Sequence, residues 1–124
     1  MRHAEIEKFC LSLPGATLSV QWGDARVFKV GGKIFAVLGP KETTPHTLSF
    51  KAGEPSFHIL THMRHIIPAP YLARAQWVHL ERLDALGTKD LKAYLQRAHA
   101  LVAAGLSKKK RAALGIAASD GIWL

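Results

Sequence analysis

Three histidines have the residue type and spacing that come closest to a metal site. His58, His62 and His65 stand at i, i+4 and i+7, so a helix would place them on one side. Imidazoles four residues apart on a helix can bind one metal ion. We expect no carboxylate or thiolate to complete such a site, and Arg64 disfavours a cation. The sequence therefore predicts no native metal and no cofactor, and the histidines form a solvated face that becomes more cationic at low pH.

Catalytic motifs are absent from the sequence. It contains no P-loop, no dinucleotide-binding fingerprint, no nucleophile elbow and no paired acidic motif. Cys10 is the single cysteine, and it lies on an apolar helical stripe where a thiol is usually inert. We therefore predict a non-catalytic protein. One cysteine cannot form an intramolecular disulfide, and no segment is apolar enough to span a bilayer, so we expect a cytoplasmic protein with no membrane role.

Positive charge is the clearest functional signal. The chain of 124 residues carries 17 Lys and Arg against 9 Asp and Glu, a net charge of +8. Such a surplus attracts polyanions, chiefly nucleic acid or an anionic membrane surface, although a basic surface can also lack a dedicated partner. No recognition helix with Arg, Asn or Gln pairs is identifiable, so binding would be weak and non-specific. The candidate contacts are the basic residues of the expected sheet, a proline-rich loop and a C-terminal run: Lys29, Lys33, Lys51, Arg74, Lys108, Lys109, Lys110 and Arg111.

Two aromatic residues flank the proline-rich loop. Tyr71 and Trp77 stand on either side of Arg74, a grouping that could stack on a base or a peptide. The alternative is that Trp77 packs between sheet and helix, as large aromatic side chains usually do, and we favour this interpretation.

Two amphipathic helices would support these residues. The first spans residues 4–13, with Ile6 and Cys10 on its apolar side, and ends at the Pro14 turn. The second spans residues 89–104 between Thr88, a plausible N-cap, and Gly105. Its core stripe and its basic polar face separate clearly. The stripe consists of Leu91, Tyr94, Leu95, Ala98, Leu101 and Val102, and the polar face includes Lys89, Lys92, Gln96 and His99.

Alternating segments predict strands over residues 17–20, 26–30, 33–38, 47–51 and 76–81. A short helix follows Pro55, and residues 66–71 form an extended loop. The two glycines at 31 and 32 suit a two-residue hairpin turn, which would place Phe28 opposite Phe35 as a buried pair. The opposite face would then carry Val27, Lys29, Ile34, Ala36 and Leu38.

The second sheet face would therefore be apolar and need cover from the chain's own tail or a second subunit. We predict that Ile122, Trp123 and Leu124 dock onto the face that carries Val27, Ile34 and Leu38. The domain itself would span residues 1–106, followed by a basic and then apolar tail over residues 107–124.

Short motifs occur along most of the chain, namely Leu13-Pro14-Gly15-Ala16, the Trp22-Gly23 turn, Val27 to Ala36 with its glycine hairpin, Leu48 with Lys51, the loop 68–71, Trp77-Val78-x-Leu80 and Leu101-Val102. Together they resemble the MmcQ/YjbR family of small bacterial domains. The resemblance covers roughly residues 3–106, and His99 stands where an aromatic residue is expected.

The resemblance implies an α+β two-layer sandwich in which helices pack on one face of an antiparallel sheet. Its element order is α-β(3)-α-β(2)-α, similar to type III secretion chaperones, whereas periodicity alone finds one strand between the second and third helices. It also implies a DNA-binding role, by analogy of fold and charge. The competing hypothesis is a protein-interaction or dimeric assembly module of the secretion-chaperone kind, so the protein would be a monomer or a homodimer.

Overall fold

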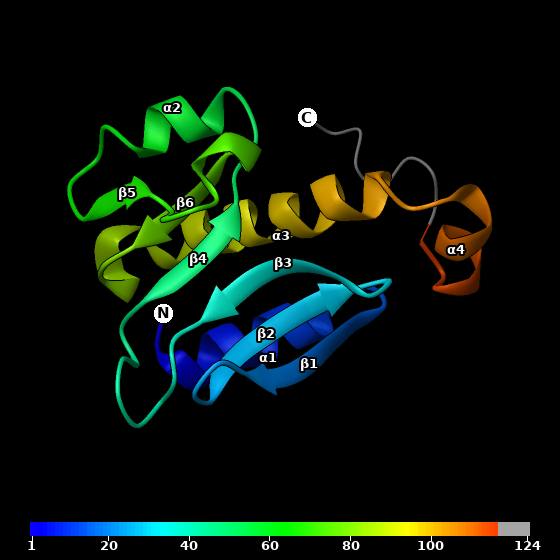
Figure 1. Cartoon of the computed structure of the whole chain (residues 1–124), viewed down its shortest axis with the longest axis horizontal. Coiled ribbons are helices and arrows are strands. Elements are labelled where there is room, and N and C mark those ends of the chain that lie inside the picture. Colours follow the sequence, from blue (N-terminus) through cyan, green and yellow to red (C-terminus); the bar gives the residue numbers. More distant parts are fainter. Residues whose placement is uncertain (117–124) are drawn as a thin grey trace.

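A six-stranded antiparallel sheet with helices on one face forms the molecule. The computed structural model describes residues 1–116, and the strand order is β1-β2-β3-β4-β6-β5 (Figure 1). In chain order the elements are α1 (His3–Ser12), β1 (Ala16–Gln21), β2 (Ala25–Val30), β3 (Lys33–Leu38), β4 (Leu48–Lys51), α2 (Ser56–Leu60), β5 (Ile66–Pro68), η1 (Ala73–Ala75), β6 (Trp77–Leu80), η2 (Leu83–Ala85), α3 (Thr88–Ala104) and α4 (Lys108–Ala113). The expected α+β sandwich is confirmed.

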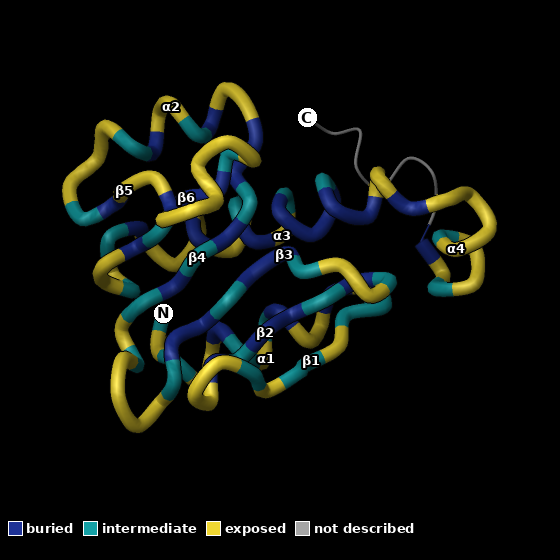
Figure 2. The backbone as a smooth tube through the Cα atoms, viewed as in Figure 1, coloured by how far each residue is buried: buried dark blue, intermediate teal, exposed yellow. Residues whose placement is uncertain are grey.

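One core fills the space between the sheet and the helices (Figure 2). Helix α1 buries Ile6 and Cys10, and α3 buries Leu91 and Leu95, as their helical spacing predicts. Burial raises the pKa of the Cys10 thiol to about 12, so this cysteine stays protonated and unreactive. Trp77 is only 7% exposed, so the prediction that it is buried is confirmed. It pairs with Lys51 and precedes the core residue Val78, so it lies on the side of the sheet turned away from the helices and not between sheet and helix.

The β2–β3 hairpin turns at two glycines, as predicted. Gly31 and Gly32 both have positive φ, at 59° and 81°, which a two-residue primed turn requires. The predicted pairing beyond the turn is wrong, because Lys29 faces Ile34 but Phe28 faces Ala36. Phe35 is thus the extra residue of a β-bulge.

The bulge moves part of β3 to the other face of the sheet. Because side chains alternate along a strand, one inserted residue reverses the faces of all that follow. Ala36 and Leu38, expected on the second face, are fully buried in the core beside Phe28. Phe28 and Phe35 are also fully buried, as expected, with ring centroids 6.4 Å apart.

Residues 66–68 form a strand, not the extended loop that we expected. β5 pairs with β6, with Ile66 opposite Leu80 and Pro68 opposite Val78. It lies at the sheet edge, where the missing N–H of a proline is tolerated. The two strands between the second and third helices agree with the family resemblance. Before α2 the structure has four strands, one more than the resemblance implies.

His99 is buried, which corrects its expected place on the polar face of α3. It is 4% exposed, and its Nε2 donates a hydrogen bond to the Pro14 carbonyl oxygen at 2.6 Å. Its ring meets Phe35 edge-on, with centroids 5.3 Å apart. A hydrogen bond to a backbone carbonyl lowers the cost of burying an imidazole. The start of α3 also differs slightly, because Gly87 and not Thr88 is its N-cap.

Candidate nucleic-acid interface

The outer face of the sheet, defined as the side turned away from the core, is mixed in character. Val27, Lys29, Ile34, Ser49 and Lys51 alternate with core residues along their strands and so lie on it. Val37 stands directly opposite Val27 and also lies on this face, so two apolar side chains adjoin there and Val27 is fully buried. The face is therefore apolar in part, as we expected, but it also carries lysine and serine. Leu38, which lies in the core, cannot receive the chain terminus there. The predicted docking of Ile122, Trp123 and Leu124 falls outside the described residues.

The strands carry positive charge only. None of the six strands contains Asp or Glu, whereas they contain Arg26, Lys29, Lys33 and Lys51. Arg26 is paired with Glu7 of α1 on the core side. Lys29 of β2 and Lys51 of β4 lie on the outer face with β3 between their strands.

The basic run at 108–111 forms helix α4, which is anchored beside the hairpin. Its N-cap is Ser107, whose hydroxyl oxygen accepts a hydrogen bond from the Lys110 N–H at 3.1 Å. On either side of the helix, Leu106 and Ile116 are buried in the core. Figure 1 shows α4 beyond the turn of the β2–β3 hairpin. The run is therefore a positioned helix and not an extended tail.

The eight predicted contacts separate into two groups. The hairpin group, at the end of the sheet where β2 turns into β3, consists of Lys29, Lys33, Lys108, Lys109, Lys110 and Arg111. The loop group consists of Lys51 and Arg74, which flank the point where Ala52 N–H donates to the Gln76 carbonyl at 2.9 Å. Among residues 1–116, the basic partners in ion pairs are Arg26, His58 and Arg82, and none of them belongs to either group. No carboxylate of the described chain therefore neutralises either group.

The three histidines do not share a helix face, so that expectation is wrong. α2 ends at Leu60, and His65 lies beyond it with φ at 66°. His58 Nε2 contacts the Glu54 carboxylate at 2.9 Å, and His62 Nδ1 donates to the His58 carbonyl at 2.6 Å. The i,i+4 spacing of Glu54 and His58 was the signal for this pair. Within residues 1–116 no cluster of side chains could hold a metal ion.

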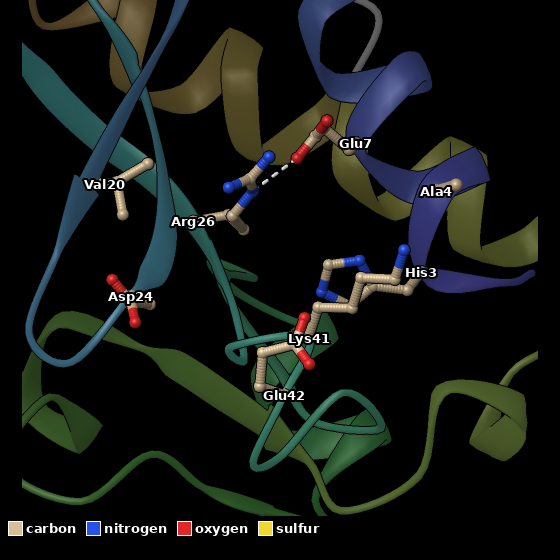
Figure 3. A pocket seen from close by; sticks show the side chains of 8 residues that line it. All are labelled: His3, Ala4, Glu7, Val20, Asp24, Arg26, Lys41 and Glu42. Atoms are coloured by element: carbon tan, nitrogen blue, oxygen red, sulfur yellow. Dashed lines mark hydrogen bonds and ion pairs between the residues drawn. The ribbon is translucent and has the colours of Figure 1, made fainter.

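A pocket that sequence reasoning missed lies between α1, the β1–β2 turn and the β3–β4 loop (Figure 3). Its volume is about 300 Å³, and it is lined by His3, Ala4, Glu7, Val20, Asp24, Arg26, Lys41 and Glu42. A hydrogen bond from Arg26 holds the pKa of Glu7 below its ordinary value. His3 Nε2 donates to the Gly39 carbonyl at 2.8 Å. The pocket mixes acids and bases, so its lining gives no strong preference for an anion or a cation.

A serine–histidine contact crosses the outer face between β4 and β6. Ser49 Oγ and His79 Nδ1 are 2.7 Å apart, and burial lowers the pKa of His79 although Glu81 opposes the shift. Acyl transfer would also require oxyanion donors and a substrate pocket beside the hydroxyl. The Ser49–His79 contact by itself supplies neither, so we interpret it as a cross-strand hydrogen bond.

No helix within residues 1–116 has the length and apolar character that crossing a membrane requires. The fold and the unneutralised lysines define a small α+β domain with a basic sheet. The family model for YjbR matches residues 11–101, and the chain belongs to the YjbR family. It is similar to the crystal structure of Deinococcus radiodurans protein DR2400, which has the family-model domain DUF419. The TM-score is 0.81 at 26% identity, covering 95% of this chain and 91% of that one. No curated protein matches the chain.

Proposed function

We propose that this protein binds nucleic acid without base specificity, through the hairpin group. The observation that carries the proposal is the placement of α4. Leu106 and Ile116 anchor the helix beside the β2–β3 turn, so four consecutive basic residues are held close to the hairpin that carries Lys33. Consecutive residues project about 100° apart around a helix, so these side chains surround α4 with positive charge. The neighbouring strands contain no carboxylate that would repel a phosphate backbone.

Charge would supply most of the affinity. Each phosphate that a lysine neutralises releases condensed counterions, so binding weakens as salt increases. A contact of this kind has a Kd on the order of 10⁻⁴–10⁻⁶ M at physiological salt and a log–log salt slope of about −0.9 for each phosphate neutralised. It carries little sequence information, because phosphates are the same in every sequence.

The test compares two triple variants by fluorescence anisotropy on two unrelated duplexes at several salt concentrations. One variant changes Lys108, Lys109 and Lys110 to Gln, which preserves helix propensity. The matched control changes three exposed lysines elsewhere, Lys8, Lys41 and Lys89, to Gln. We expect the α4 variant to have a salt slope shallower by up to about 3 units, with the control close to the wild type.

Two results would contradict the proposal. Equal losses in both triple variants would show that net charge matters and the α4 surface does not. An absence of binding to either duplex at low salt would remove the nucleic-acid function altogether.

A second candidate function, self-association, is favoured by the edge strand β1. It pairs only with β2, and its six residues contain no charge, no proline and no bulge, the features that usually protect an edge. Three exposed apolar side chains lie in or near it: Val20 within the strand, Trp22 in the turn that follows and Leu11 in α1, at 50%, 65% and 40% exposure. Under this alternative β1 pairs with β1 of a second copy, and the dimer is insensitive to salt. Sedimentation of the wild type and Val20→Lys would test it, because a charge on the edge should abolish the dimer.

A further inference from the structure

The loop between β5 and β6 presents an aromatic ring entirely to solvent. Tyr71 has a relative exposure of 104%, so its side chain packs against nothing in residues 1–116. Its φ is 65°, in the left-handed region that a bulky residue rarely adopts. Figure 2 shows the surrounding chain as exposed. Strain without compensating packing points to a role outside the fold itself.

Backbone hydrogen bonds hold this loop in one conformation. Leu72 N–H donates to the Ala69 carbonyl at 3.1 Å, and Trp77 N–H donates to the Leu72 carbonyl at 3.2 Å. Ala69 N–H donates back to the Trp77 carbonyl at 3.0 Å, which closes the loop onto the buried end of β6. These bonds fix the backbone on both sides of Tyr71. The backbone of Tyr71 therefore has a defined position, from which the ring extends into solvent.

Positive charge accompanies the ring. Arg74 is exposed three residues after Tyr71, and Lys51 stands opposite Trp77 where the loop rejoins the sheet. The carboxylate that hydrogen-bonds the loop is Glu54, whose Oε1 accepts from Gln76 Nε2 at 2.8 Å and also contacts His58. Glu54 is thus engaged in holding the end of the loop. Arg74 and Lys51 have no carboxylate partner among the described residues.

We propose that residues 69–76 bind unpaired nucleotides, with a base stacked on Tyr71 and the neighbouring phosphates on Arg74 and Lys51. The inference rests on the proposed function and extends it to single strands. A base inside a duplex has both faces covered by its neighbours, whereas an unpaired base offers a face to an aromatic ring. Arg74 in the same loop and Lys51 on the adjoining strand favour a polyanion over a protein partner.

Three fluorescent probes separate stacking from charge at one low salt concentration. They are a deoxythymidine oligomer of about 12 nucleotides, an abasic oligomer with the same phosphates, and a duplex of the same length. The variants are Tyr71→Ala, which removes the ring, and Tyr71→Phe, which keeps it. Trp22→Ala is the matched control, because Trp22 is an exposed aromatic residue at a different turn.

We expect the wild type to bind the deoxythymidine oligomer more tightly than the abasic one. Tyr71→Ala should weaken binding to the former about 5- to 150-fold and leave the other two probes unchanged. Tyr71→Phe and Trp22→Ala should bind as the wild type does. If Tyr71→Ala binds the deoxythymidine oligomer normally while duplex binding remains salt-dependent, the loop has another partner and this inference is wrong. If none of the probes binds, the proposed function has failed with it.

Discussion

Phe35→Ala is the substitution that tests the packing of the β-bulge most directly. Phe35 is fully buried, and its ring contacts Phe28 and His99. Removing a buried phenylalanine ring costs about 3–5 kcal/mol, because the apolar surface is lost and the cavity collapses only in part. A chain of 124 residues has a total stability of roughly 6–19 kcal/mol at 0.05–0.15 kcal/mol per residue. The variant should therefore lose between about a sixth and most of its stability.

Urea denaturation followed by far-ultraviolet circular dichroism measures this loss. With a slope of about 1–3 kcal/mol per molar urea, the midpoint should fall by at least about 1 M. Lys33→Ala, two residues earlier on an exposed site, is the control and should change stability by no more than about 0.5 kcal/mol. A loss below about 1 kcal/mol for Phe35→Ala would mean that the ring does not fill the core, and the reasoning about the bulge would be refuted.

Three further substitutions test the register, the strained loop and the Arg26–Glu7 pair. Ala36→Asp should lower the free energy of unfolding by more than about 4 kcal/mol, because Ala36 is fully buried. If chemical denaturation shows almost no loss, Ala36 lies on the outer face and the register is wrong. Tyr71→Gly should stabilise the protein by up to about 1 kcal/mol by removing a left-handed non-glycine residue, and a lower melting temperature would instead show that Tyr71 packs. Arg26 lowers the pKa of Glu7 in the folded state, so the pair stabilises at neutral pH and this contribution is lost as the pH falls below the ordinary value of 4.5. The melting temperature of Glu7→Gln should therefore lie below that of the wild type at neutral pH and approach it in acid. A difference that stays constant across pH would show that the Arg26–Glu7 pair does not cause the loss of stability.

Local signals made most of the fold predictable. The two glycines before Lys33 indicated the hairpin, and the spacing of Leu91, Leu95 and Ala98 indicated α3. These features depend on residues close in the chain, where turn chemistry and helical periodicity act directly. β5 escaped detection because its three residues are too few for an alternation and end in proline.

Features that depend on distant residues could not be read from the sequence. The bulge at Phe35 exchanges the face of Ala36, and the turn residues alone do not encode it. His99 is buried because a carbonyl at Pro14 receives its hydrogen bond, and the helical pattern around His99 contains no trace of that partner. The basic residues of the candidate site were identifiable by type. Their division into a hairpin group and a loop group required the packing of Leu106 and Ile116.

The contact between Gly31 and Leu106 couples the hairpin turn to the segment that leads into α4. A β-carbon added at residue 31 would lie 2.6 Å from Cδ1 of Leu106, which is too close for any real pair of atoms. A larger residue at 31 would therefore both strain the left-handed turn, where φ is 59°, and push against Leu106, so a smaller residue at 106 would remove only the second cost. Because α4 begins directly after Leu106, an uncompensated change in the hairpin turn would displace the basic helix without altering a single charge. A substitution in the hairpin turn would thus change the contribution of every basic residue of α4 at once. Mutating the lysines one at a time would not reveal this dependence.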